Sequence, residues 1–134
     1  MHLHAALITV LNVVIIYVAM VLVGRARDRY QVKAPAVTGN VDFERVFRAH
    51  QNTLEQTLMF LPSLWLAAIY CNERYAAWLG YAWIFGRAWY LLGYIRPGGN
   101  RGAGFVISLG STTLLLGWSL FCIAARLLGM AGAG

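Results

Sequence analysis

Three polar side chains recur at helical spacing inside a largely apolar stretch, at Arg48, Asn52 and Glu55. At about 100° per residue, Asn52 lies roughly 40° and Glu55 roughly 20° from Arg48 around a helix, so the three share one face. A second stripe with the same kind of spacing lies in the next apolar stretch and consists of Arg87, Tyr90 and Tyr94. The two stripes would place guanidinium, carboxylate, amide and phenol groups between neighbouring helices.

The charges in these stripes do not balance, because Glu55 is one carboxylate against Arg48, Arg87 and Arg101. An ionised group inside a membrane is costly unless it is paired, so internal pairing of Glu55 with Arg48 or Arg87 is one interpretation. The excess of arginine favours another, a site for an anion, since guanidinium groups bind anionic oxygens in a fixed geometry. The other donors and acceptors suit a small ligand with several polar arms, and they are His50, Gln51, Asn52, Tyr90 and Tyr94.

The composition indicates that lipid surrounds the elements that carry these residues. Of the 134 residues, 60% are hydrophobic and 12% are charged, whereas a soluble domain carries about 25% charged residues. The net charge of +6 could indicate nucleic-acid binding, but the basic residues lie in short segments between apolar stretches. That distribution is typical of membrane orientation, so we predict an integral membrane protein with no nucleic-acid partner.

Four stretches are long enough to cross a bilayer as helices, since about 20 helical residues span the hydrocarbon core. Proline and glycine punctuate the first and third of the loops between them, most clearly at 97–99, and Asn72, Glu73 and Arg74 form a tight turn between the second and third stretches. We predict an all-α protein, one transmembrane domain over 1–134 whose four helices lie at about 3–23, 42–71, 75–95 and 102–128. Close helix contacts are expected at four glycines with seven-residue spacing, which are Gly86, Gly93, Gly110 and Gly117.

Basic residues gather in the first and third loops, whereas the opposite side of a four-helix topology holds only Arg74 and Arg126. The positive-inside rule therefore predicts that the first and third loops are cytoplasmic and that both termini lie on the opposite side. The first apolar run has no basic residue before it and no convincing cleavage site. We expect a retained helix there rather than a signal peptide.

The cysteine and N-terminal histidine residues predict no further site. Cys71 and Cys122 lack metal-ligand spacing and lie in or at the end of apolar stretches. We interpret them as structural thiols rather than as a disulfide or as metal ligands. His2 and His4 are not four residues apart, so they make a poor metal pair on a helix, and we expect no metal.

The stretch 39–55, GNVDFERVFRAHQNTLE, resembles the signature of the MAPEG family, the membrane-associated proteins in eicosanoid and glutathione metabolism. Supporting motifs keep the family order over nearly the whole chain, and they are RAR at 25–27, FLPSLW at 60–65 and GRAWYLLGY at 86–94. The run RAHQNTLE at 48–55 is most similar to the type-three branch of the microsomal glutathione transferases.

The resemblance implies a four-helix protomer that assembles as a homotrimer, with glutathione bound between protomers near the cytoplasmic face. It implies that the ligand contacts Arg27, Arg48, His50, Asn52, Glu55, Arg87, Tyr90 and Tyr94. Arg101 matches the arginine that activates the thiol, because a fixed guanidinium stabilises the nucleophilic thiolate. The implied activity is a detoxifying glutathione transferase, with glutathione peroxidase activity left open, acting on hydrophobic electrophiles or lipid hydroperoxides that arrive through membrane lipid.

Several alternatives remain open at this point. Asp28 and Gln56 stand where the leukotriene-C synthase branch carries arginine and tyrosine, which argues against leukotriene synthesis. Arg101 has a simpler alternative role as an orienting charge in its loop. A non-catalytic lipid-binding or scaffold protein of the same fold is the alternative function. An ion carrier is disfavoured, because segments 1–24 and 102–125 contain no Asp, Glu, Lys or Arg.

Overall fold

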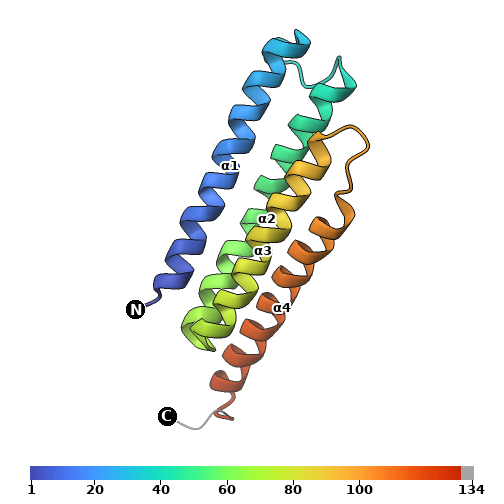
Figure 1. Ribbon diagram of the computed structural model, residues 1–134. Helices are drawn as coiled ribbons and strands as arrows, with labels where there is room; N and C mark the ends of the chain where they lie inside the picture. The colour runs from blue at the N-terminus through green and yellow to red at the C-terminus, as the bar shows by residue number, and fades with distance from the viewer. Residues whose placement is uncertain (131–134) are drawn as a thin grey trace.

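The computed structural model describes residues 1–130 and consists of four helices, α1 (Leu3–Tyr30), α2 (Val41–Tyr70), α3 (Glu73–Ile95) and α4 (Gly102–Leu127). They form an elongated up-and-down bundle (Figure 1). Loops 31–40 and 96–101, with the helix ends beside them, form what we call the basic end. The start of α1, the end of α4 and the α2–α3 turn form the opposite end, which we call the far end.

Helix α1 continues past the expected end at residue 23 and stops at Tyr30. Arg25, Arg27 and Arg29 extend it, because arginine has good helix propensity and a cation is favourable at the C-terminal end of the helix dipole. The thickness of the bilayer limits only the apolar part of a helix. The length of the apolar run therefore underestimates the length of the helix. Helix α2 begins after an N-cap, Asn40, whose Oδ1 accepts hydrogen bonds from backbone N–H groups at 2.9 and 3.0 Å.

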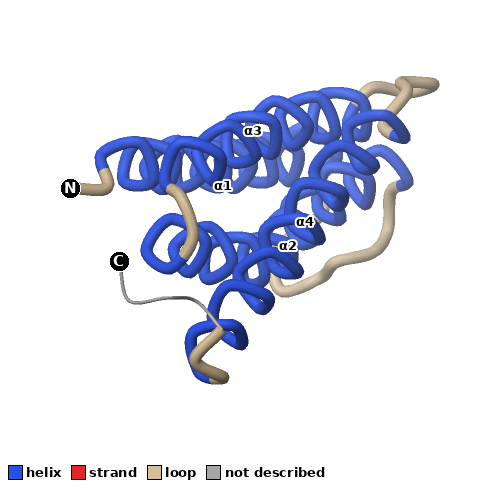
Figure 2. Tube along the Cα trace, turned by 90° about the horizontal axis from the view of Figure 1, so that it is seen from below, coloured by secondary structure: helices blue, strands red, loops and turns tan. Residues whose placement is uncertain are grey.

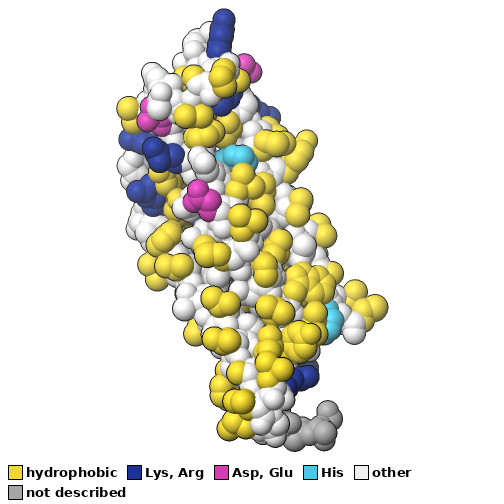
Figure 3. Space-filling model, turned by 180° about the vertical axis from the view of Figure 1, so that it is seen from behind, with side chains coloured by type: hydrophobic (Ala, Val, Ile, Leu, Met, Phe, Trp, Pro, Cys, Tyr) yellow, Lys and Arg dark blue, Asp and Glu magenta, His cyan; other side chains and the backbone are white. Residues whose placement is uncertain are grey.

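Two helices, Leu3–Tyr30 and Gly102–Leu127, are long and apolar enough to cross a membrane by length and composition. Helix α2 carries charged residues through its first half, and α3 contains polar and aromatic side chains along its length. Large hydrophobic side chains are nevertheless exposed on every helix, and examples are Val10, Leu58, Phe85 and Leu120. Hydrophobic side chains are also spread along the face seen in Figure 3, below charged groups that gather at the basic end. An apolar surface of this extent fits a lipid environment.

Helices α2 and α3 together form the centre of the packing, because each contacts all three other helices, whereas α1 and α4 do not touch each other within residues 1–130 (Figure 2). A Cβ at Gly86 would lie 2.8 Å from the Ile107 side chain, and one at Gly104 would meet the backbone of α3. These glycines therefore allow α3 and α4 to approach closely.

The four glycines expected at close helix contacts divide into two pairs. Gly86 packs closely against α4, as expected, whereas a Cβ at Gly93 would collide with the backbone of Asn100, which lies in the loop before α4. Gly110 and Gly117 have no described neighbour within 4 Å of a built Cβ, so the prediction for that pair is wrong for contacts within the protomer. The physical reason is that Gly104, rather than either of them, occupies the α4 position facing α3.

A disulfide joins Cys71 and Cys122, whose Cα atoms are 5.8 Å apart. The prediction of unpaired thiols is therefore wrong. Helices α2 and α4 run in the same direction in the bundle (Figure 1), so the C-terminal ends of both reach the far end side by side. The two cysteines are 51 positions apart in the chain, and local spacing could not reveal a contact made by the topology.

Candidate functional site

A hollow of about 250 Å³ lies between α2 and α3 towards the basic end, and its lining consists of Arg48, Gln51, Asn52, Glu55, Tyr90 and Tyr94. The two polar stripes meet here because residues three and four apart share one face of a helix and because α2 packs against α3. Cationic, anionic, amide and phenol groups therefore surround one small space, as the sequence predicts. We call this space the arginine hollow.

Arg87 does not line the arginine hollow but lies behind it, with its side chain fully buried. Its Nη1 donates to Asn52 Oδ1 at 3.0 Å, and its Nη2 donates to Ser108 Oγ at 2.8 Å. A guanidinium group can only donate, so Asn52 must present its oxygen to Arg87 and its NH₂ group elsewhere. Arg87 thereby orients the Asn52 amide as a donor at the hollow.

Ser108 was not expected from the sequence to belong to this network. It is fully buried, and its hydroxyl also donates to the carbonyl oxygen of Gly104 at 3.0 Å. Because a serine hydroxyl both donates and accepts, it can satisfy Arg87 and α4 together. The sequence signal for this role was a serine within a helix that carries no charge before Arg126. Serine is also common in membrane helices because it is small enough for close helix packing, so the signal is weak.

Two tyrosine rings connect the buried arginine to the exposed one. The Arg87 guanidinium lies 4.5 Å from the centre of the Tyr90 ring, and that of Arg101 lies 4.0 Å from the centre of the Tyr94 ring. The two ring centres are 5.4 Å apart. Cations over aromatic faces are held by the ring quadrupole, so this row places Arg101 beside the arginine hollow although it begins a different helix.

Arg101 lines an adjoining hollow of about 330 Å³, which shares Tyr94 with the arginine hollow. The other side chains of this second hollow include two more arginines, Arg45 and Arg96. Positive charge therefore continues from the site to the loop at the basic end. The arrangement suits an anion that extends from one hollow into the other.

Glu55 and Arg48 are both exposed on the outside of the protomer. The ion pairs among residues 1–130 are His2 with Glu73 and Arg45 with Asp42, so Glu55 pairs with neither Arg48 nor Arg87. The interpretation of these charges as internal helix glue is therefore wrong for the protomer. Arg87 is the one buried charged side chain in the part of the chain that the structure describes, and its hydrogen-bond partners are neutral.

Two residues of the implied glutathione set lie away from the arginine hollow. Arg27 Nη1 donates to the carbonyl oxygen of Ala36 at 2.7 Å, and the guanidinium lies 4.9 Å from the centre of the Phe43 ring. His50 is half-buried on α2 and is absent from the lining of the hollow. A single protomer thus brings together only part of the implied set.

Comparison with known proteins identifies the family. The family model for MAPEG matches residues 5–121. The chain belongs to the MAPEG family. This MAPEG protein is 50% identical over 113 residues to an uncharacterized protein of Synechocystis sp., which covers 84% of the chain and 82% of that protein.

Two named relatives follow. The MAPEG chain is 44% identical over 106 residues to microsomal glutathione S-transferase 2 of Mus musculus, covering 79% of the chain and 72% of that enzyme. It is 36% identical over 123 residues to leukotriene C4 synthase of Cavia porcellus, covering 92% of the chain and 82% of that protein. The family expectation is confirmed, and the transferase relative carries the type-two name where the sequence motif resembled the type-three branch. Family membership and two strongly apolar helices together indicate a membrane protein.

Proposed function

We propose that this MAPEG protein is a membrane-bound glutathione transferase that binds glutathione in the arginine hollow. The observation that carries the proposal is the unbalanced charge in and beside the hollow, where Glu55 is the one carboxylate against Arg48 in the lining and Arg101 at the edge. Glutathione carries two carboxylates, an amine and a thiol, so it would supply the missing negative charge. The identity to microsomal glutathione S-transferase 2, at 44% in mouse and 47% in human, supports the same assignment.

The lining suggests how each part of the tripeptide is held. Arg48 would bind a carboxylate, and Glu55 would bind the ammonium group. Asn52 would donate its NH₂ group to a carbonyl or carboxylate oxygen, because Arg87 occupies its Oδ1. Tyr90 and Tyr94 would donate their hydroxyl groups to the backbone of the ligand.

Arg101 is the candidate catalytic residue, since it lies over Tyr94 at the edge of the hollow. Its guanidinium would stabilise the thiolate of glutathione over the thiol. The thiolate sulfur would then attack an electrophilic carbon, forming a C–S bond while the leaving group departs with its electron pair. Attack of the thiolate on a lipid hydroperoxide instead would break the O–O bond, form an S–O bond and release the alcohol after protonation. The resulting glutathione sulfenic acid would react with a second glutathione thiol to give the disulfide and water, which completes the peroxidase form of the activity.

We propose that a homotrimer completes the site. The arginine hollow of about 250 Å³ is smaller than the 300–1,000 Å³ of most small-molecule sites. The exposed Arg48 and Glu55 would be costly against lipid, because ionised groups at membrane depth need partners. A neighbouring protomer would cover them, and its Arg27 and His50 would supply the two residues that lie outside the hollow of their own chain.

The orientation proposed from the basic loops has independent support. All four helices would cross the membrane, with the basic end cytoplasmic and both termini on the opposite side. The Cys71–Cys122 disulfide lies at the far end, and disulfides persist in oxidising compartments outside the cytosol. Charge and cysteine chemistry thus favour the same orientation.

Calorimetric titration of the protein in mild detergent with glutathione tests the proposal. We expect saturable binding that Glu55→Gln weakens by about tenfold, because a hydrogen bond to a charged group is worth about 1.5–3 kcal/mol. Glu73→Gln, at the far end, is the matched control and should bind normally. Conjugation of a hydrophobic electrophile and reduction of a lipid hydroperoxide are then measured side by side. Absence of binding at millimolar glutathione would instead favour the non-catalytic lipid-binding function.

A further inference from the structure

Another hollow, of about 820 Å³, lies at the far end, and we call it the far hollow. It opens between the start of α1 and the start of α3, and its lining includes His4, Glu73, Arg74, Tyr75, Trp78 and Tyr81. Its volume lies within the range of small-molecule sites. Arg74 and Tyr94 are 20 positions apart on α3, so the two hollows are separated by about 30 Å along that helix.

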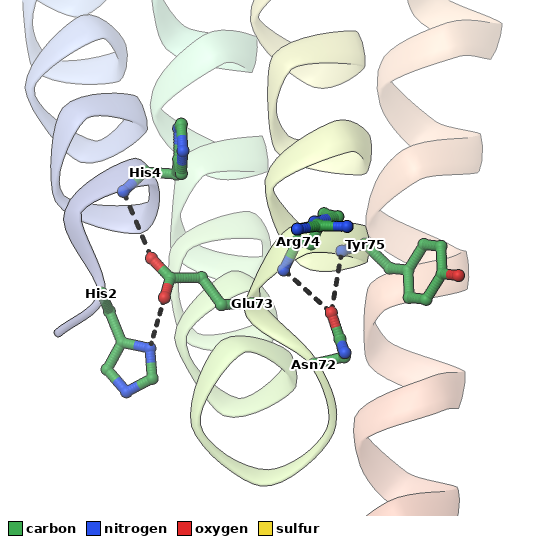
Figure 4. A network of polar contacts seen from close by, with 6 residues as sticks. All are labelled: His2, His4, Asn72, Glu73, Arg74 and Tyr75. Atoms are coloured by element: carbon green, nitrogen blue, oxygen red, sulfur yellow. Dashed lines mark hydrogen bonds and ion pairs between the residues drawn. The ribbon is translucent and has the colours of Figure 1, made fainter.

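The carboxylate of this far hollow is already occupied by its own chain. Glu73 Oε2 lies 3.4 Å from His2 Nδ1, and Glu73 Oε1 accepts a hydrogen bond from the backbone N–H of His4 at 3.3 Å (Figure 4). The start of α3 is also capped, because Asn72 Oδ1 accepts from the backbone N–H of Arg74 at 3.0 Å. Glu73, the acidic residue in the lining of this hollow, is therefore engaged by the start of α1.

The Arg74 guanidinium, by contrast, is exposed and forms no ion pair or side-chain hydrogen bond with residues 1–130. In Figure 4 it extends away from Glu73. Beside it, His4 Nδ1 and the Tyr81 hydroxyl are joined at 3.0 Å and add further polar atoms to the same hollow. One unpaired cation with neighbouring imidazole and hydroxyl groups is suited to a phosphate.

An apolar stripe leads from this cation along α3. Trp78 and Phe85 are 73% and 60% exposed, and Tyr81 lies between them on the same face. Exposed Leu92 continues the stripe, so it runs for about 20 Å from Trp78. That length exceeds the half-thickness of a bilayer, about 15 Å, and Trp and Tyr are typical of the level where lipid headgroups meet the hydrocarbon.

We propose that the far hollow binds a membrane glycerophospholipid, with its phosphate on Arg74 and an acyl chain along the Trp78–Tyr81–Phe85 face of α3. The unpaired positive charge of Arg74 favours a phosphate group as the ligand. The apolar stripe beside it favours a lipid phosphate over a free anion. The site requires a membrane-embedded far end but neither glutathione nor the arginine hollow. It therefore stands or fails separately from the proposed transferase activity.

Native mass spectrometry of the protein in mild detergent tests the site. Wild-type protein and the variants Arg74→Gln and Arg126→Gln are titrated with phosphatidylglycerol and phosphatidylcholine. Arg126 is also an exposed arginine towards the far end, but it does not line the hollow. We expect discrete lipid adducts on wild type and Arg126→Gln, and a loss of affinity of about tenfold for Arg74→Gln. Trp78→Ala should also weaken the adducts, because it removes the apolar wall.

Equal lipid retention by Arg74→Gln and Arg126→Gln would overturn the proposal, since it would show that lipid coats the surface without a site. Displacement of the lipid by inorganic phosphate at equal concentration would also overturn it, by identifying a free-anion site. Glutathione titration of Arg74→Gln provides a separate readout. Unchanged glutathione affinity together with lost lipid adducts is the expected result, and it distinguishes a lipid site from general unfolding.

Discussion

At both ends of the bundle a carboxylate lies near basic side chains, but the two carboxylates are used differently. Glu73 at the far end contacts His2 and the backbone of His4, which join the start of α3 to the start of α1. Glu55 at the basic end has no ion pair among residues 1–130, although Arg48 lines the same hollow. The chain satisfies the first carboxylate and leaves the second open.

This difference separates structural charge from charge that is available to a ligand. The Glu73 contacts connect two helices, so their effect is confined to the protomer. Arg48 and Glu55 lie on one stripe because of the geometry of α2 alone. A ligand that brings a carboxylate to Arg48 and an ammonium group to Glu55 would stabilise both charges. The presence of an arginine does not by itself identify a ligand contact. Arg87 is buried and donates a hydrogen bond to Asn52, whereas Arg101 is exposed.

The largest effect on activity is expected from substitution of Arg101. Its role decides whether the basic end is catalytic or only carries the charge that orients the protein. Arg101→Leu should lower kcat/KM by about 10²–10³, the usual loss when a group that stabilises a developing or resident anion is removed. The near-ultraviolet absorbance of the bound thiolate should disappear while glutathione still binds. Arg25→Leu, an exposed arginine of α1, is the control. Normal thiolate formation in Arg101→Leu would leave Arg101 as an orienting charge.

A smaller effect is expected from the buried side of the site. Arg87→Met and Asn52→Ala should each weaken glutathione binding by about 10-fold to 100-fold, because either change removes the oriented Asn52 donor. The double variant should lose little more than either single one, since Arg87 acts through Asn52. Titration calorimetry of all four proteins completes this cycle. Fully additive losses would mean that Arg87 contributes to binding by another route, such as its charge.

The smallest effect is expected at the far end. Glu73→Gln should lower the free energy of unfolding by at most about 1 kcal/mol, because partly exposed ion pairs contribute little. Thermal unfolding in detergent measures this change, and glutathione affinity should be unaffected. A loss of glutathione affinity equal to that of Glu55→Gln would show that the two ends are coupled and would remove the contrast between them.

Local spacing predicted the side chains that line the arginine hollow, but it also predicted His50 and Arg87, which do not line it. Arg48, Asn52 and Glu55 share a face because of helix geometry alone, and Tyr90 with Tyr94 follow the same rule. Spacing could not show that Arg87 turns inward while Arg48 remains outside, since that depends on the rotation of each helix against its neighbours. The same limit hid Ser108, whose partner lies 21 positions earlier in the chain.

The helix count was accessible from the sequence for a similar reason, because loops at 31–40 and 96–101 contain proline and glycine. The end of α1 could not be predicted from the apolar run alone, because the arginines after that run continue the helix. The disulfide required knowledge that α2 and α4 end side by side. Whether an exposed charge meets lipid or another protomer is likewise decided between chains rather than within one.

The Cys71–Cys122 bond closes a covalent ring that contains all of α3 and most of α4. A protease that cuts the 96–101 loop opens the chain inside this ring, so one product carries Cys71 and the other carries Cys122. The products would migrate as one species on a non-reducing gel and as two after reduction. Many such cuts would separate Tyr94 from Arg101 in the chain. The disulfide at the far end would still connect the two fragments, so cleavage at the basic end need not separate the residues of the site.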